Sequence, residues 1–360
     1  MKKNIRAVMI AVVVLVAVIF SACSSIEKKQ EIVIDLTDCE EVINYSTFAD
    51  SVSYLTLNVE EGIAMGEVSR LYKWKDYYYI GASSRDGVLV YDTSGKLVSH
   101  INSYGEGPEH FRKITSFAVV ASTGDVCIYD YASRKINCYD ILGTFKYSIA
   151  CPYWAVDILK FNEEQTVYIC PFYGGNENPS GIWLTDNQNT FVKYLQDNVT
   201  SEHMFYYYPV TYIPEINGFY YYDRNWDDFS WVTMDTIQTI YQFDFKQKIP
   251  GAMTGDMRLN PVKLNGYGIC NYYAYSPSHL LIGFWQFIYE KNQDKRRFLW
   301  ALVDNRTQDV TIAKKLHNDF DETVIDNPSL FYLDSSTWAR VCDESKDDFG
   351  IRIQLLHLKK

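Results

Sequence analysis

Basic residues are scarce in this 360-residue sequence. It has 34 Lys and Arg against 45 Asp and Glu, for a formal net charge of −11. Nucleic acid is not an expected partner, because phosphate binding needs a basic face. Proline (10) and glycine (19) are also few, whereas aromatic residues reach 16%. Aromatic side chains suit the half-buried surface of strands, so the composition favours a strand-rich globular fold.

Motifs that announce an enzyme are missing as well. The sequence contains no GxSxG, HExxH, P-loop or GxGxxG pattern, and no CxxC. Its six histidines are scattered, with none paired at metal spacing. The acidic stretches 319–322 and 343–348 lack the alternating oxygen ligands and glycine of a calcium loop. The sequence therefore predicts no metal, no cofactor and no recognisable catalytic centre.

The N-terminus has the pattern of an export signal. Lys2, Lys3 and Arg6 precede an uncharged run over residues 7–22, which is shorter than the roughly 20 residues of a membrane-spanning helix. Cys23 follows Ser-Ala and resembles the acylated cysteine of a bacterial lipobox, although Phe20 stands where leucine is usual. We predict a signal peptide over residues 1–22, lipidation of Cys23 and a tether over 23–31. An ordinary secretory signal or an uncleaved anchor is the alternative.

Cysteine pairing is constrained by strand register. Eight cysteines are present, and most of them lie in apolar strand-like runs, where cysteine is usually a small buried hydrophobe. If Asp130 and Lys135 flank a tight turn, Cys127 lies opposite Cys138. A cross-strand disulfide between these two is then geometrically feasible.

A repeat of about 45 residues runs along the chain. Residues 77–102 contain three strand-like runs separated by a polar break and a Thr-Ser-Gly turn, and residues 125–150 repeat this order. Each is preceded by an apolar strand, at 68–74 and 114–120. Four short strands joined by turns are the sequence form of a propeller blade. Weaker units follow at about 154–196, 205–249, 266–316 and 320–360.

These units predict an all-β, six-bladed β-propeller over residues 32–360. The last unit has about two clear strands, whereas the stretches 32–36 and 51–58 have no unit of their own. An N-terminal strand is therefore expected to complete the last blade, because closure removes exposed sheet edges. A pair of β-sandwiches is the competing fold, but it does not explain the repeat.

Residues 87–150 carry a family resemblance. They include the runs 90–92 (Val-Tyr-Asp), 105–111 (Gly-Glu-Gly-Pro-Glu-His-Phe), 128–130 (Ile-Tyr-Asp) and 139–143 (Tyr-Asp-Ile-Leu-Gly). In these runs the chain resembles the six-bladed, NHL-like β-propeller lipoproteins of Gram-negative gut bacteria. His110 stands where that family usually has glutamate. The resemblance implies the fold and a lipid anchor in the cell envelope, on the periplasmic face or the outer-membrane surface. It implies no catalytic residues, because the family has no agreed activity.

One mouth of the propeller channel is the candidate ligand site. In a four-stranded blade, the links between blades and the middle hairpin loops share a face. The charged residues expected there are Glu106, Glu109, His110, Arg112, Arg85, Asp86 and Arg134. We predict a non-enzymatic protein that binds a glycan, peptide or envelope protein at this mouth. A polysaccharide hydrolase or lyase that uses channel carboxylates is the alternative, and a shaped inter-blade turn with solvated charges is the simplest interpretation of 105–109.

Overall fold

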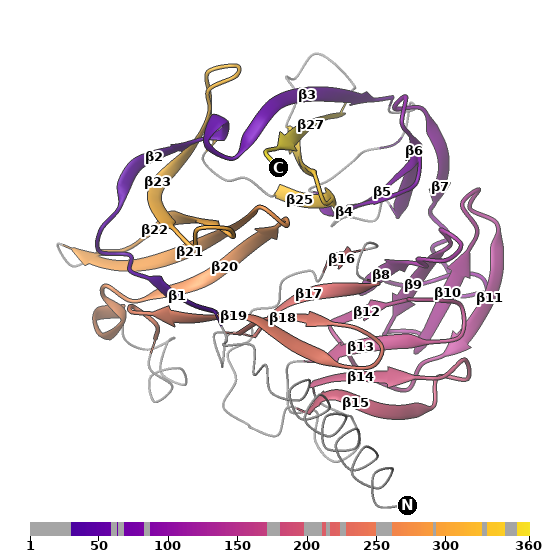
Figure 1. Cartoon of the computed structure of the whole chain (residues 1–360). Coiled ribbons are helices and arrows are strands. Elements are labelled where there is room, and N and C mark those ends of the chain that lie inside the picture. Colours follow the sequence, from indigo (N-terminus) through magenta and orange to yellow (C-terminus); the bar gives the residue numbers. More distant parts are fainter. Residues whose placement is uncertain are drawn as a thin grey trace, which may run out of the picture.

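Six small β-sheets follow one another along the chain in the computed structural model (Figure 1). The structure describes residues 30–58, 63, 68–82, 87–170, 181–197, 211–213, 217–223, 228–249, 261–290, 293–325, 330–342 and 351–360. Within these ranges the helices are two short 3-10 turns, η1 (Tyr45–Thr47) and η3 (Pro261–Leu264). The protein is thus all-β in the part that the structure describes.

The sheets are numbered here in chain order. Sheet 1 consists of β4 (Val68–Trp74), β5 (Tyr77–Ala82), β6 (Val88–Asp92) and β7 (Leu97–Ile101). Sheet 2 consists of β8 (Ser116–Val119), β9 (Val126–Asp130), β10 (Lys135–Tyr139) and β11 (Phe145–Ala150). Sheet 3 consists of β12 (Asp157–Leu159), β13 (Thr166–Cys170), β14 (Gly181–Thr185) and β15 (Phe191–Asp197).

The second half of the chain adds strands from the N-terminus to each sheet. Sheet 4 contains β16 (Thr211–Ile213), β17 (Gly218–Asp223), β18 (Asp228–Val232) and β19 (Ile237–Phe245), with β1 (Gln30–Ile34) at its edge. Sheet 5 contains β20 (Gly268–Tyr275), β21 (His279–Glu290), β22 (Gln293–Asp304) and β23 (Val310–Asn318), flanked by β2 (Glu40–Asn44) and β24 (Thr323–Ile325). Sheet 6 contains β25 (Leu330–Asp334), β26 (Thr337–Cys342), β27 (Ile351–Leu358) and β3 (Ala49–Leu57).

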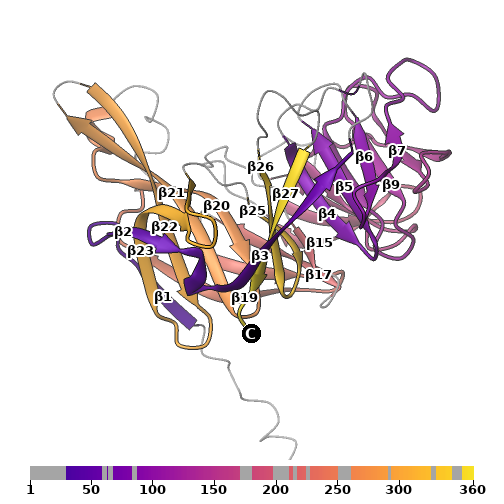
Figure 2. The same cartoon turned by 90° about the horizontal axis from the view of Figure 1, so that it is seen from above.

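The N-terminal strands differ in how they join these sheets. β1 and β2 add in parallel to β19 and β23, whereas β3 pairs antiparallel with β27, the last strand of the chain. Figure 2 shows β1 and β2 along sheets 4 and 5, and β3 beside β27. The N-terminal strand thus completes the last sheet, as predicted. β1 begins at Gln30, two residues before the predicted start of the propeller at residue 32, because its ladder with β19 continues past the buried Ile32.

A recurring aspartate turn explains the sequence repeat. Asp92, at the end of β6, accepts hydrogen bonds from the backbone N–H groups two and four residues later. Asp140 and Asp186 do the same at the ends of β10 and β14. The residue three positions after each aspartate has a positive φ: Gly95 at 81°, Gly143 at 83° and Asn189 at 63°. Glycine and asparagine tolerate this conformation best. The turn therefore explains why an aspartate recurs with glycine or asparagine three positions after it.

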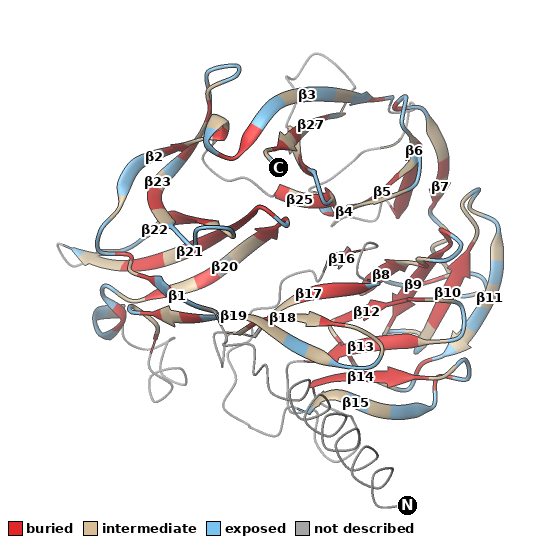
Figure 3. Ribbon diagram, viewed as in Figure 1, coloured by how far each residue is buried: buried red, intermediate tan, exposed pale blue. Residues whose placement is uncertain are grey.

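The core lies between the sheets, which pack face to face. Apolar clusters join sheet 6 to sheet 1, sheet 1 to sheet 2, sheet 2 to sheet 3 and sheet 3 to sheet 4, and one large cluster spans sheets 4, 5 and 6. Figure 3 shows buried residues along the strands near the middle and exposed residues on β3, β11 and β15. Tyr78 and Tyr79 of β5 and Tyr220 of β17 are core residues, each at most 5% exposed.

Candidate functional site

Side chains of sheet 2 hold the segment that carries most of the predicted site residues. Residues 103–112, called here the link segment, connect β7 of sheet 1 to β8 of sheet 2. Three side chains of β10 hold its backbone carbonyls. Lys135 donates to the oxygens of Gly107 and Pro108, Asn137 Nδ2 donates to that of His110 at 2.9 Å, and Tyr139 donates to that of Glu109 at 2.6 Å. The structure thus supports a shaped inter-sheet connection here.

The charged side chains of the link segment point to solvent. Glu106 is 80% exposed and pairs with Arg112 at 3.1 Å, and Glu109 and Arg134 are also exposed. The His110 ring lies against Gly105 and Gly107, where a Cβ on either glycine would come within 3 Å of it. Arg85 and Asp86 lie outside the described residues. The predicted residues that the structure describes therefore share a surface but form no enclosed site.

A hollow lies at the opposite end of β8. The space free for a water-sized sphere measures about 30 Å³, and about 510 Å³ when the gaps between atoms and the part open to solvent are counted. Its lining residues come from β4, β8, β12 and β25, or directly follow one of these strands: Tyr72, Lys73, Trp74, Ala118, Val119, Ala121, Leu159, Lys160, Tyr332 and Leu333. Each of these four is the first strand of its sheet, and the lining residues lie at its C-terminal end. The link segment instead precedes β8, so the two features lie at opposite ends of the first strands.

Trp74 is fixed in the wall of the hollow. Its Nε1 donates to the Ala121 carbonyl at 2.8 Å. Gly124 has a φ of 81°, and a Cβ there would lie 2.6 Å from the indole ring. The Lys75 ammonium lies 4.1 Å from the ring centroid on one side, a cation–π arrangement. Trp74 is thus held by its hydrogen bond and by the close approach of a glycine.

A buried polar cluster joins the first strands nearer to their N-terminal ends. Arg70 of β4 pairs with Asp157 of β12 at 2.8 Å, and both side chains are at least 92% buried. Ser116 of β8 donates to Asp157, and Arg70 also donates to the Tyr72 hydroxyl at 2.9 Å. Burial lowers the pKa of Arg70, but the Asp157 carboxylate more than offsets this, so the net shift is upward. The guanidinium therefore stays charged, and this ionic layer separates the hollow from the other end of the strands.

Lys160 is the most unusual ionisable group at the hollow. The residue is only 2% exposed, and burial lowers the pKa of its ammonium to about 8. Nζ donates to the Glu163 carbonyl at 3.0 Å and to Thr166 Oγ1 at 3.2 Å. Among the described residues no carboxylate lies within ion-pair distance of it. Lys73, on the same hollow, is instead paired with Asp334 at 2.9 Å.

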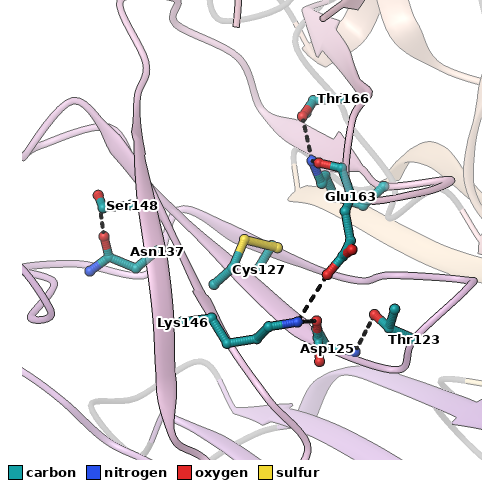
Figure 4. Close-up of a disulfide and its surroundings, with 10 residues drawn as sticks. Thr123, Asp125, Cys127, Asn137, Lys146, Ser148, Glu163 and Thr166 are labelled. Atoms are coloured by element: carbon teal, nitrogen blue, oxygen red, sulfur yellow. Dashed lines mark hydrogen bonds and ion pairs between the residues drawn. A yellow bond between two sulfur atoms is a disulfide. The ribbon is translucent and has the colours of Figure 1, made fainter. Parts of the chain in front are cut away.

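Glu163 forms an ion pair with another lysine. Its carboxylate accepts from Lys146 at 2.9 Å, and Lys146 also contacts Asp125 at 2.5 Å (Figure 4). This ion pair ties sheet 2 to the turn after β12. Glu163 also attracts the Lys160 ammonium from a greater distance, which offsets part of the effect of burial on the pKa of Lys160.

The structure contains a disulfide between Cys127 and Cys138 (Figure 4). The two residues are direct cross-strand partners in the β9–β10 ladder, the register predicted from the sequence. Their Cα atoms are 4.1 Å apart, close to the spacing of a non-hydrogen-bonded antiparallel pair. Both side chains are fully buried.

Two features are absent from the described ranges. No three His, Cys, Asp or Glu side chains lie in an arrangement that could hold a metal ion in the part of the chain that the structure describes. Within that same part, no helix has both the length and the apolar character needed to cross a membrane.

Comparison with known proteins places the chain in a family. Residues 31–346 match the family described as Domain of unknown function (DUF4934), and the chain belongs to it. A Bacteroides fragilis protein whose name describes it as exported has a similar structure, with a TM-score of 0.67 and 14% identity over 92% of this chain and 99% of that one. A Bacteroides vulgatus member of the DUF4221 family has a TM-score of 0.54 and 10% identity, over 86% and 97% of the two chains. No curated protein matches the sequence.

Proposed function

We propose that this protein is a lipid-anchored, six-bladed β-propeller of the cell envelope that binds a ligand at one mouth of its central channel. The observation that carries the proposal is the order of packing. Each sheet contacts its neighbours in sequence, and sheet 6 contacts sheet 1. Such an order suits six blades around an axis, closed by β3. In this arrangement the hollow, which the first strands enclose at one end, is a mouth of the channel.

Export is supported by two features. The N-terminal pattern ends at Cys23, and the disulfide between Cys127 and Cys138 suits an oxidising compartment outside the cytosol. We expect Cys23→Ser to move the protein from the membrane fraction to the soluble fraction of the envelope. Radiolabelled palmitate should be incorporated by the wild-type chain and not by the Cys23→Ser variant. Equal membrane recovery of the two proteins would remove the lipid anchor from the proposal.

We propose the hollow, and not the link segment, as the binding site. Concave sites with a few convergent polar groups and an apolar lining are typical of ligand recognition, and the hollow has both. The ligand is a glycan, a peptide or part of an envelope protein. Of the carboxylates around the hollow, Asp157 and Asp334 are both ion-paired. This arrangement favours binding over hydrolysis or elimination by free channel carboxylates.

Thermal unfolding can show which of the two ends of the first strands binds the ligand. A ligand at 100 times its dissociation constant stabilises the folded state by about 2.7 kcal/mol, which shifts the melting temperature by a few degrees. We expect an oligosaccharide or peptide that produces this shift to lose it in Trp74→Ala. The double variant Glu106→Ala/Glu109→Ala, at the other mouth, should keep it. The opposite result would return the site to the link segment.

A further inference from the structure

We infer that the hollow binds an anionic group, the carboxylate or sulfate of a small acidic ligand, through Lys160 with help from Lys73 and Lys75. This inference rests on the proposed function, because it names the chemistry of the same site. It goes further by assigning the charge that the ligand must carry and the residues that recognise it.

Lys160 is a buried ammonium that has no carboxylate within ion-pair distance among the described residues. An ammonium has three donors, and two of them reach neutral oxygens, the Glu163 carbonyl and Thr166 Oγ1. Burying a charge is costly unless it is paired. An anion in the hollow would supply the missing partner and accept the third hydrogen bond. Burial lowers the pKa of Lys160, and the more distant Glu163 carboxylate offsets only part of this effect.

The charge of the lining has one sign. Lys73 and Lys160 are its only ionisable groups besides tyrosine, and no carboxylate belongs to it. Lys75 adds a third ammonium over the Trp74 ring. The protein as a whole carries a net charge of −11, so the sign of this lining is opposite to that of the whole chain. Electrostatic complementarity of this kind selects the partner.

Asp334 acts as an internal competitor. It holds Lys73 at 2.9 Å, with both side chains 29% exposed. An incoming anion must share Lys73 with this carboxylate. Removal of the Asp334 charge should therefore strengthen anion binding, an effect that a purely structural role of the pair would not produce.

Matched probes test the inference on the intact, detergent-solubilised protein by calorimetry. Glucuronate and glucose share a ring and differ in one carboxylate. Sulfate and the dipeptide Gly-Glu separate the sugar, inorganic and peptide sources of an anion. We expect glucuronate, sulfate or Gly-Glu to bind at concentrations up to about 10 mM and glucose to bind at least tenfold more weakly.

Four variants assign the residues. Lys160→Met should weaken anion binding about tenfold or more, the value of a charged hydrogen bond. Lys75→Gln, on an exposed side chain that the fold does not need, should weaken it about twofold to threefold. Asp334→Asn should tighten it. Lys113→Gln, an exposed lysine of similar charge that precedes β8 at the other end, should leave it unchanged.

The pH dependence gives an independent readout. Around Lys160 the charged neighbours are Glu163 and Lys146 beyond the β12 turn, Asp125 on sheet 2, and Lys73 with Asp334 across the hollow. The ammonium loses its proton near its pKa of about 8. The affinity for an anion should therefore fall as the pH rises from about 7 to about 9, and this fall should be absent in Lys160→Met.

The outcomes separate the inference from the proposed function. Equal binding of glucose and glucuronate, or no binding of any anion, overturns the anion site. If neutral ligands bind and Trp74→Ala abolishes their binding, the proposed function stands without it. If Lys75→Gln and Lys113→Gln have the same effect and Asp334→Asn weakens binding, the charge acts from outside the hollow and the inference is wrong.

Discussion

The two ends of the first strands differ in how their polar groups are used. At the link-segment end, the side chains of Lys135, Asn137 and Tyr139 donate hydrogen bonds to backbone carbonyls of the link segment. At the hollow end, Lys160 is buried with neutral partners alone among the described residues. The polar side chains of the first end hold the backbone of the link segment, whereas at the second end a buried ammonium has only two acceptors for its three donors among the described residues.

This difference shows why a conspicuous motif can be structural. The run Gly105-Glu-Gly-Pro-Glu109 is conspicuous in the sequence because glycine widens and proline restricts the range of backbone conformations. In the structure these residues shape a connection, and the exposed ion pair between Glu106 and Arg112 belongs to a class of contacts worth about 0–1 kcal/mol. The residues of the hollow carry no motif. They come from four separate sheets and meet only in three dimensions.

The largest expected effect breaks the ionic layer that separates the two ends. Arg70→Met leaves the Asp157 carboxylate buried without its partner, which should lower the free energy of unfolding by about 3–5 kcal/mol. Denaturant unfolding followed by tryptophan fluorescence measures this change. The loss should be smaller at low pH, where Asp157 takes up a proton.

A surface pair of the same charges provides the control. Glu106→Gln removes the partner of Arg112 at the exposed end, and we expect a change below about 0.5 kcal/mol. A similar loss in both variants would show that burial does not distinguish the two ends. A loss below about 1 kcal/mol for Arg70→Met would contradict the buried pair.

A smaller effect should loosen the link segment without touching the hollow. Asn137→Ala removes the hydrogen bond to the His110 carbonyl and the one accepted from Ser148. We expect a loss of about 1–3 kcal/mol and faster proteolysis within residues 103–112, while ligand binding at the hollow is unchanged.

Ser148→Ala is the matched variant for this prediction. It removes the hydrogen bond between Ser148 and Asn137 but keeps the bond to the link segment. Proteolysis should therefore remain slow in Ser148→Ala. Equal cleavage of the two variants would mean that Asn137 does not hold the segment.

Much of the fold could be predicted from local sequence. The runs around β5, β6, β9, β10 and β11 are apolar or alternating, and β6 and β10 end in the aspartate turn. Their strands and the Cys127–Cys138 register were therefore predicted correctly. Other strands gave little signal. β12 and β16 have three residues each, and β18 and β20 were not recognised because their neighbours in sequence are polar or aromatic without a clear period of two.

The third aspartate turn shows a specific limit. Asn189 replaces glycine at the positive-φ position, so the Asp-x-x-Gly pattern is lost while the geometry is kept. Asn189 also accepts a hydrogen bond from Tyr168 and donates to the Ala150 carbonyl. Its side chain thus adds a tertiary role that a glycine could not have.

The sequence by itself determined the apolar and alternating strands, the glycine-containing turns and the Cys127–Cys138 register, because these depend on residues close together in the chain. Only the tertiary structure decided which polar groups share a partner and which are left alone. Arg70 and Asp157 are 2.8 Å apart although they belong to different sheets, and Lys160 lies beside Thr166 rather than a carboxylate. Burial and counter-ion distance are properties of the packed sheets, and they fix the charge that the hollow offers to a ligand.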